Sequence, residues 1–347
     1  IQDSDLSWFH SASDAFIRRA GAIFEDMVRM LRRHPAIICW IVMNEPDLWK
    51  VAEENGLMKL DEKPVSMMDA RPGPQLVAVL KQLDPTRPYI KGSHFTNDPE
   101  SGDTHDYTGS ITGGETHYFD NYGKRFKLLS EFGMDLPGDA ENLRSVPKYY
   151  ERIKPVYEDK GTFKELCEYR RRYLKYVTEY CRIQKKDPCS GYFQFLFSDV
   201  SPQSFYGLTD WWGTLKCDAD YCLESNQPVG VFMEYTKDAP VAIWAANDTP
   251  ADLPGCSAEW YVTDENGAVV TSGKKSATLP ADGVLRIEGL TFGVSAGRRY
   301  NVRLLLTDAG GRLIAQNHYS DAFRRIEHPK GHPLRIDHEL GMRLYWA

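Results

Sequence analysis

Residues 36–46 read AIICWIVMNEP, and residues 126–133 read FKLLSEFG. Both runs are short, apolar and without alternation, and each reaches a glutamate, Glu45 in the first and Glu131 in the second. Such a pattern is typical of strands buried on both faces of a parallel sheet. In a barrel of parallel strands, the carboxyl ends of the strands form the reaction face. The runs therefore predict two carboxyl groups at one face, which is what glycoside hydrolysis requires.

The sequence around the first run alternates between helix and strand patterns. A helix is predicted from an N-cap at Ser13 to a stop at Pro35, with an apolar stripe that includes Ile23 and Phe24. A long polar loop follows the first run at residues 47–73. Further helices are predicted at residues 74–83 and 163–183, and further strands at residues 88–92 and 191–199. Helices and strands joined by short connections are the repeat of an α/β barrel.

The periodicity changes near residue 238. Short alternating strands are predicted at residues 241–246, 259–263, 285–288 and 300–307, with turns at Asn266-Gly267 and Gly310-Gly311. This pattern predicts an immunoglobulin-like β-sandwich. The predicted fold class is therefore α/β: a partial TIM (β/α)8 barrel over residues 1–237, an all-β sandwich over residues 238–325 and a tail over residues 326–347. We expect the end of the tail, residues 344–346, to pack against the body of the protein.

The composition limits the partners and cofactors. The 347 residues carry a net charge of −7 and the basic residues are scattered, which argues against a nucleic-acid partner. No apolar run reaches membrane-spanning length, so no membrane partner is expected. The seven cysteines form no C-x-x-C pair and have no nearby His cluster, so no metal site is predicted. Their odd number favours free thiols, which leans toward a reducing compartment and leaves a cytoplasmic or periplasmic location open.

A resemblance to a known family rests on both runs together. Residues 34–45, HPAIICWIVMNE, followed by residues 130–133, SEFG, resemble the catalytic barrel of glycoside hydrolase family 2, nearest its β-mannosidase-like branch. The resemblance extends from residue 2 to about residue 216, and more loosely into the C-terminal third. Residues 1–3 resemble the end of the third barrel strand, so we expect an N-terminally truncated barrel. Because an open barrel exposes strand edges, we expect this stretch by itself to be poorly soluble or inactive.

The resemblance implies a retaining exo-β-glycosidase whose chemistry requires no metal or organic cofactor. Glu131 would be the nucleophile, and Glu45 would be the general acid and then the general base. Asn44 would bind the sugar 2-hydroxyl. Further substrate-binding residues would be Asp3, His105, Tyr107, which replaces the family's usual Trp, and Trp211 at the rim.

The expected partner is a carbohydrate, and the oligomeric state is not predicted. β-Mannosides are the first expectation and β-galactosides stay open. β-Glucuronides are disfavoured, because the family's Asn-x-Lys motif for the sugar carboxylate is absent.

Two rival functions have support in the sequence. A non-catalytic carbohydrate-binding protein on a degenerate barrel is favoured by Phe195 and Ser198, where the family often has Trp and Asn. An endo-acting β-glycanase is the other rival, because Asn-Glu-Pro also ends the fourth strand in related endoglycanase barrels. Several single residues also have structural interpretations: Asn44 as a backbone cap, His105 as a buried hydrogen-bonded histidine, Trp40 as core, and at least one of Trp211 and Trp212 as packing.

Overall fold

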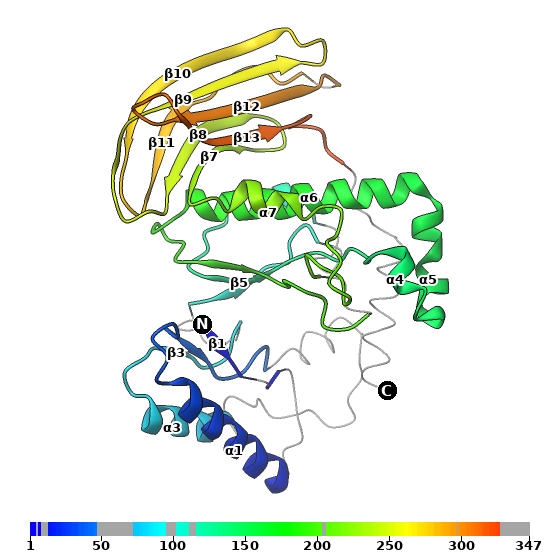
Figure 1. The fold of residues 1–347 in the computed structure, drawn as a ribbon, viewed down its shortest axis with the longest axis vertical. Coiled ribbons are helices and arrows are strands. Elements are labelled where there is room, and N and C mark those ends of the chain that lie inside the picture. The colour runs from blue at the N-terminus through cyan, green and yellow to red at the C-terminus, as the bar shows by residue number, and fades with distance from the viewer. Residues whose placement is uncertain are drawn as a thin grey trace. The chain divides into compact units, whose positions relative to one another are not determined.

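The structure is a computed structural model that describes residues 1–4, 6–7, 13–46, 72–94, 102–110, 116–202, 206–295 and 297–326. These residues belong to two compact units, one within Ile1–His105 and the other within Asp106–Ile336. Helices and parallel strands occur in both units, and antiparallel sheets in the second, so the chain is mixed α/β (Figure 1). No helix in the described part of the chain is long and apolar enough to cross a membrane. Most of the predicted loop at 47–73, and residues 344–346, lie outside the described residues.

The first unit contains a parallel sheet of order β1-β2-β3. Its strands are β1 (Gln2–Asp3), β2 (Trp40–Ile41) and β3 (Tyr89–Ile90), and β4 (Thr104–His105) follows in the chain. The strand predicted over residues 36–43 is therefore real but shorter. Its hydrogen bonding continues beyond β2, because the Ser93 amide donates to the Met43 carbonyl at 2.8 Å.

Two helices accompany this sheet, α1 (Asp14–Leu31) and α3 (Gly73–Leu83). The predicted N-cap of α1 is confirmed, since the Ser13 hydroxyl accepts from the Phe16 amide at 3.3 Å. The predicted stripe is wrong at Ile23, which is 52% exposed, because the buried face is narrower than the apolar pattern. The core shared by the helices and β2 contains Phe24, Val28, Trp40, Leu76 and Leu80.

Trp40 is a core residue, as its structural interpretation predicted. It is fully buried, and its indole N–H donates to the Asp84 carboxylate at 2.9 Å. The same carboxylate accepts from Arg87 at 2.7 Å and from Thr86 at 2.8 Å. Burial by itself would raise the pKa of Asp84, but these hydrogen bonds outweigh it and lower the pKa. A charged group therefore fixes the central strand to the end of α3.

The second unit begins with parallel strands and long helices. Strands β5 (Leu129–Phe132) and β6 (Tyr192–Gln194) are parallel neighbours. The helix predicted over residues 163–183 is confirmed as α6 (Lys160–Ile183), whereas the strand predicted over residues 191–199 is shorter than expected. The remaining helices are η1 (Tyr118–Asn121), α4 (Ala140–Leu143), α5 (Pro147–Glu158) and α7 (Asp220–Ser225).

Two antiparallel sheets complete the second unit, with orders β10-β9-β12-β13 and β11-β8-β7 (Figure 1). Their strands are β7 (Val229–Tyr235), β8 (Pro240–Asn247), β9 (Leu253–Asp264), β10 (Val269–Leu279), β11 (Gly283–Gly289), β12 (Tyr300–Thr307) and β13 (Leu313–Tyr319). All four strands predicted in this part are present, while β7, β10 and β13 were missed. β7 lies before residue 238 and pairs with β8.

The predicted turns between these strands are confirmed by their backbone. Gly267 and Gly311 each have φ of +79°, a left-handed conformation that favours glycine. Buried side chains of both sheets and of α6 belong to one core, among them Tyr173, Val231, Ile243, Val262 and Leu304. The sheets and α6 therefore stabilise one another.

The expectation that the cysteines are free thiols is wrong for two of them. Cys167 on α6 and Cys217 form a disulfide, with their Cα atoms 6.4 Å apart. The two residues are 50 positions apart, and their proximity depends on how the chain returns to α6, which the spacing of cysteines does not reveal. The free cysteines in the described residues are Cys39, Cys181, Cys189, Cys222 and Cys256.

Arg170 joins α6 to the segments beside it. Its buried guanidinium donates to both oxygens of Asp218, at 2.9 and 3.0 Å, and to the carbonyls of Met134 and Tyr206. We expect Asp218→Asn to lower the free energy of unfolding by about 3–5 kcal/mol, because it leaves a buried guanidinium without its counter-charge. Urea unfolding followed by tryptophan fluorescence measures this loss.

Asp220→Asn is the matched control for this variant. The Asp220 side chain is 58% exposed in its ion pair with Arg171, so we expect a loss below about 1 kcal/mol. Equal losses for the two variants would contradict the structural role of the buried pair.

Candidate functional site

Glu45 lies just beyond the central strand of the first unit. Its backbone has φ of +44°, in the left-handed region that a non-glycine residue seldom adopts. Its amide donates to the Ser93 carbonyl at 3.1 Å, and its side chain is 15% exposed. Strained backbone held by its surroundings clusters at functional sites. The end of the strand therefore fixes the backbone of Glu45, and most of its side chain is buried.

The Glu45 carboxyl group contacts His105, which lies on β4. The distance from Glu45 Oε1 to His105 Nδ1 is 2.8 Å. The other ring nitrogen, Nε2, lies 2.9 Å from the Ser93 hydroxyl, which donates to Asp103 at 2.7 Å. His105 is thus buried and hydrogen-bonded, and one of its partners is the proposed acid. Ser93 and Asp103 were not predicted, because their contacts with the imidazole depend on packing that the sequence pattern does not reveal.

Asn44 and Asp3 lie near the same strand ends. The backbone amide of Asn44 donates to the Leu6 carbonyl at 2.8 Å. Its side-chain oxygen is buried and has no hydrogen-bond partner among the described residues. An unpaired buried acceptor costs about 1–3 kcal/mol, which a donor from a ligand would offset. Asp3 lies on β1, where one carboxylate oxygen accepts from the Ser4 amide at 2.8 Å.

Glu131 lies inside β5 rather than after it. Its backbone carbonyl accepts from the Asp106 amide at 2.9 Å, and its carboxylate accepts from the Tyr107 hydroxyl at 2.7 Å. The Tyr107 ring lies edge-on to the ring of Tyr206, with 5.9 Å between centroids. The Tyr107 hydroxyl is therefore a hydrogen-bond donor to the Glu131 carboxyl group.

The packing around Gly133, which follows β5, requires a glycine at this position. A Cβ atom at Gly133 would collide with the Phe195 carbonyl, and would also lie 3.2 Å from the Tyr206 ring. The Phe195 amide donates to the Phe132 carbonyl at 2.8 Å across this contact. Gly133 is therefore needed for the close approach of the two chain segments beyond Glu131.

Trp211 and Trp212 lie in the loop after β6 and are 51% and 39% exposed, so the expectation that one of them packs is not met. Asp199 and Lys216 lie on the two sides of this loop and form an almost fully buried ion pair, with 2.9 Å between Oδ2 and Nζ. This pair joins the two sides of the loop. Burial and the charge of Arg170 lower the pKa of Lys216 to about 8 against the opposing effect of Asp199. Both tryptophans are therefore exposed in the loop that this ion pair closes.

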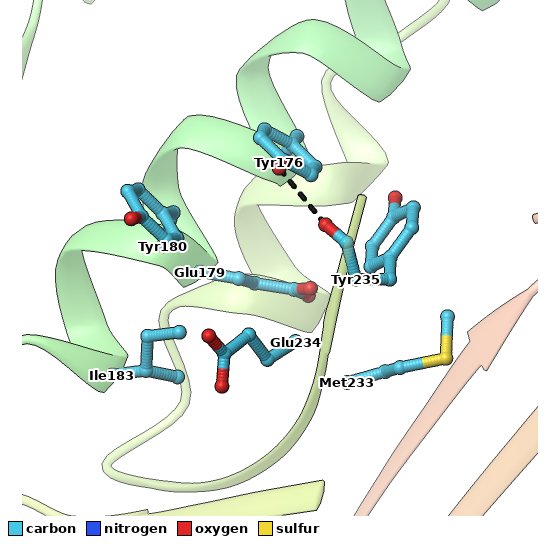
Figure 2. A pocket seen from close by; sticks show the side chains of 7 residues that line it. All are labelled: Tyr176, Glu179, Tyr180, Ile183, Met233, Glu234 and Tyr235. Carbon is cyan, nitrogen blue, oxygen red and sulfur yellow. Dashed lines mark hydrogen bonds between the residues drawn. The ribbon is translucent and has the colours of Figure 1, made fainter. Parts of the chain in front are cut away.

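A cavity elsewhere in the second unit is too small for a sugar. Figure 2 shows it between α6 and β7, where the Tyr176 hydroxyl donates to the Tyr235 carbonyl at 2.9 Å. Its volume of ≈ 10 Å³ admits about one water molecule. Glu179 at its wall accepts from Lys175 and from Tyr319, each at 2.7 Å, and is a paired structural group.

Two solved structures resemble the chain over most of its length. A β-D-mannosidase from Dictyoglomus thermophilum is 20% identical, with a TM-score of 0.69, and the match covers 94% of this chain and 43% of that chain. The exo-chitosanase CsxA from Amycolatopsis orientalis is 16% identical, with a TM-score of 0.64, and the match covers 89% of this chain and 39% of that one. No family model matches the chain, and no curated protein matches it.

These similarities confirm the resemblance at the level of the fold. The chain shares its fold with part of the β-D-mannosidase and part of the exo-chitosanase, and it spans less than half the length of each.

Proposed function

We propose that this chain carries the two catalytic carboxyl groups of a retaining exo-β-glycosidase. In this proposal residues 1–237 are part of a (β/α)8 barrel, residues 238–325 are an immunoglobulin-like sandwich and residues 326–347 are a tail. Glu131 is the nucleophile, and Glu45 is the general acid and base. Their carboxyl groups should then lie about 5–5.5 Å apart across one sugar, as a retaining mechanism requires.

The observation that carries the proposal is the contrast between the partners of the two glutamates. Glu131 accepts from the Tyr107 hydroxyl, and a donated hydrogen bond favours the carboxylate form of the group that receives it. Glu45 contacts Nδ1 of His105 at 2.8 Å, and an imidazole nitrogen can either donate to a carboxylate or accept from a protonated carboxyl group. Two carboxyl groups in such different surroundings suit an ionised nucleophile and a protonated acid.

The reaction follows from these roles. In the first step Glu131 attacks the anomeric carbon, and the bond to the leaving oxygen breaks as Glu45 protonates that oxygen. In the second step Glu45 takes a proton from water, the water oxygen attacks the anomeric carbon, and the Glu131 ester bond breaks. The sugar leaves with its original anomeric configuration, and both carboxyl groups return to their starting states.

The proposed substrates are glycosides with a terminal β-linked sugar, with β-mannosides first and β-galactosides as the alternative. The fold shared with a protein named β-D-mannosidase supports this order. The buried side-chain oxygen of Asn44 suits a sugar hydroxyl, because a hydroxyl would supply the donor that it lacks among the described residues. Asp3, His105, Tyr107 and Trp211 are proposed as further binding residues.

A panel of 4-nitrophenyl β-glycosides tests the function in the full-length protein. We expect turnover of the β-mannoside or the β-galactoside, with the β-anomer of the sugar released first in an NMR time course. Turnover with release of the α-anomer would contradict the retaining mechanism. No turnover of the mannoside, galactoside, glucoside or glucuronide would overturn the enzyme proposal and favour a non-catalytic sugar-binding role. Cleavage only within long polysaccharides would favour an endo-acting enzyme.

A further inference from the structure

Three buried side chains form a hydrogen-bond chain that ends on the Glu45 carboxyl group. Asp103, Ser93 and His105 are 7%, 2% and 8% exposed, so water competes little for their contacts. We propose that Asp103 and Ser93 are positioning residues: they keep a proton on His105 Nε2, and the Glu45–His105 pair thereby holds the proton that Glu45 delivers. The proposal rests on the role of Glu45 in the proposed function.

The direction of the hydrogen bonds determines which nitrogen of His105 is protonated. The Ser93 hydroxyl has one proton and donates it to Asp103 Oδ2 at 2.7 Å. The His94 amide, 3.2 Å from the same oxygen, also favours a carboxylate there. Ser93 Oγ can then only accept from His105 Nε2, which lies 2.9 Å away. Nε2 must therefore carry a proton, and Asp103 selects this state through Ser93.

The proton on Nε2 determines where the proton lies in the contact between His105 Nδ1 and Glu45 Oε1. At 2.8 Å a lone pair on Nδ1 and a carboxylate oxygen would repel, so a proton lies between them. Together with the proton on Nε2, this makes the pair neutral overall. If the relay did not protonate Nε2, a neutral imidazole could donate from Nδ1 to a Glu45 carboxylate. The pair would then be one proton poorer, and its remaining proton could pass to a leaving oxygen only by forming an imidazolate anion.

The relay also serves both steps of the reaction. In the first step one proton passes from the Glu45–His105 pair to the glycosidic oxygen as its bond to the anomeric carbon breaks. The emptied contact then sets the Nδ1 lone pair against the Glu45 carboxylate, which raises the affinity of the pair for a proton. In the second step the attacking water returns one proton to the pair. The relay thus supports Glu45 as acid and as base without a net change in protons.

The ring of His105 is also held in orientation. His94 stacks on it with 5.2 Å between ring centroids and 16° between planes. Ser93 contacts Glu45 by a second route, through its carbonyl and the Glu45 amide. Ser93→Ala keeps that backbone bond and removes only the hydroxyl, so it isolates the relay.

The kinetic test compares two leaving groups in full-length Ser93→Ala. For the 4-methoxyphenyl glycoside of the accepted sugar, whose phenolate needs a proton to leave, we expect kcat/KM to fall about tenfold or more. For the 2,4-dinitrophenyl glycoside, which leaves without protonation, we expect a loss below about threefold. Asp103→Asn should show the same split. Equal losses on both substrates, or no loss on either, would overturn the relay.

Thr86→Ala is the matched control. The Thr86 hydroxyl donates to the buried Asp84 carboxylate at 2.8 Å, a contact similar to that of Ser93 with Asp103 but outside the relay. We expect no difference between leaving groups in this variant. A split as large as in Ser93→Ala would contradict a specific relay.

A spectroscopic test separates the relay from the proposed function. In protein labelled with ¹⁵N-histidine, with the His105 signals assigned by His105→Asn, we expect Nε2 to be protonated in the wild type. Ser93→Ala should reduce that protonation. An unprotonated Nε2 in the wild type would overturn the relay even if the protein is an active glycosidase. A wild type inactive on the glycoside panel would overturn the proposed function, and the ¹⁵N signals would still decide whether the relay exists.

Discussion

Replacing Glu131 with Gln is expected to abolish turnover, with kcat/KM falling more than about 10⁴-fold on every glycoside that the wild type hydrolyses. The amide has no anionic oxygen to form the glycosyl ester. Gln has nearly the same shape and still accepts from the Tyr107 hydroxyl through its carbonyl oxygen, so β5 should keep its structure. Steady-state kinetics with 4-nitrophenyl glycosides measures the loss. Mass spectrometry of the wild type after treatment with a 2-deoxy-2-fluoroglycoside should find the label on Glu131.

Glu141→Gln is the control for this variant. Glu141 is an exposed glutamate on α4, and we expect its replacement to leave kcat/KM unchanged. A fluorosugar label on any other residue would exclude Glu131 as the nucleophile. So would a Glu131→Gln protein that keeps a tenth or more of the wild-type rate.

Replacing Glu45 with Ala is expected to lower kcat/KM about 10²–10⁴-fold for a glycoside with a poor leaving group, because proton transfer to the leaving oxygen is lost. For the 2,4-dinitrophenyl glycoside we expect a much smaller loss in the first step. The second step then limits turnover, since no base activates water. Azide, which needs no base, should restore the rate and give a glycosyl azide with the substrate's anomeric configuration.

The Glu45→Ala prediction has a matched control variant and two results that would contradict it. Glu25→Ala removes an exposed glutamate of α1 that pairs with Arg29, and we expect neither a leaving-group dependence nor an effect of azide. A Glu45→Ala protein that loses equally on good and poor leaving groups and does not respond to azide would exclude Glu45 as the acid and base. An azide product of inverted configuration would assign the nucleophile's role to Glu45 instead.

The sequence predicted the elements whose signals are local. The Ser13 cap, the helix over residues 163–183 and the strand over residues 300–307 were all confirmed, since capping, periodicity and alternation act within a few residues. The lengths of the parallel strands around residues 36–43 and 191–199 were overestimated. An apolar run reports burial, whereas a strand also needs hydrogen-bonded neighbours, which other parts of the chain provide.

The sequence by itself determined that Glu45 and Glu131 each end an apolar run, and that Asn44 precedes the first of them. Only the tertiary structure decided their partners: His105 for Glu45, Tyr107 for Glu131, and the Ser93–Asp103 pair behind His105. The same holds for the disulfide between Cys167 and Cys217. The physical reason is that hydrogen bonds and disulfides depend on distances of a few ångströms between segments far apart in the chain, which follow from packing and leave no periodic signal in the sequence.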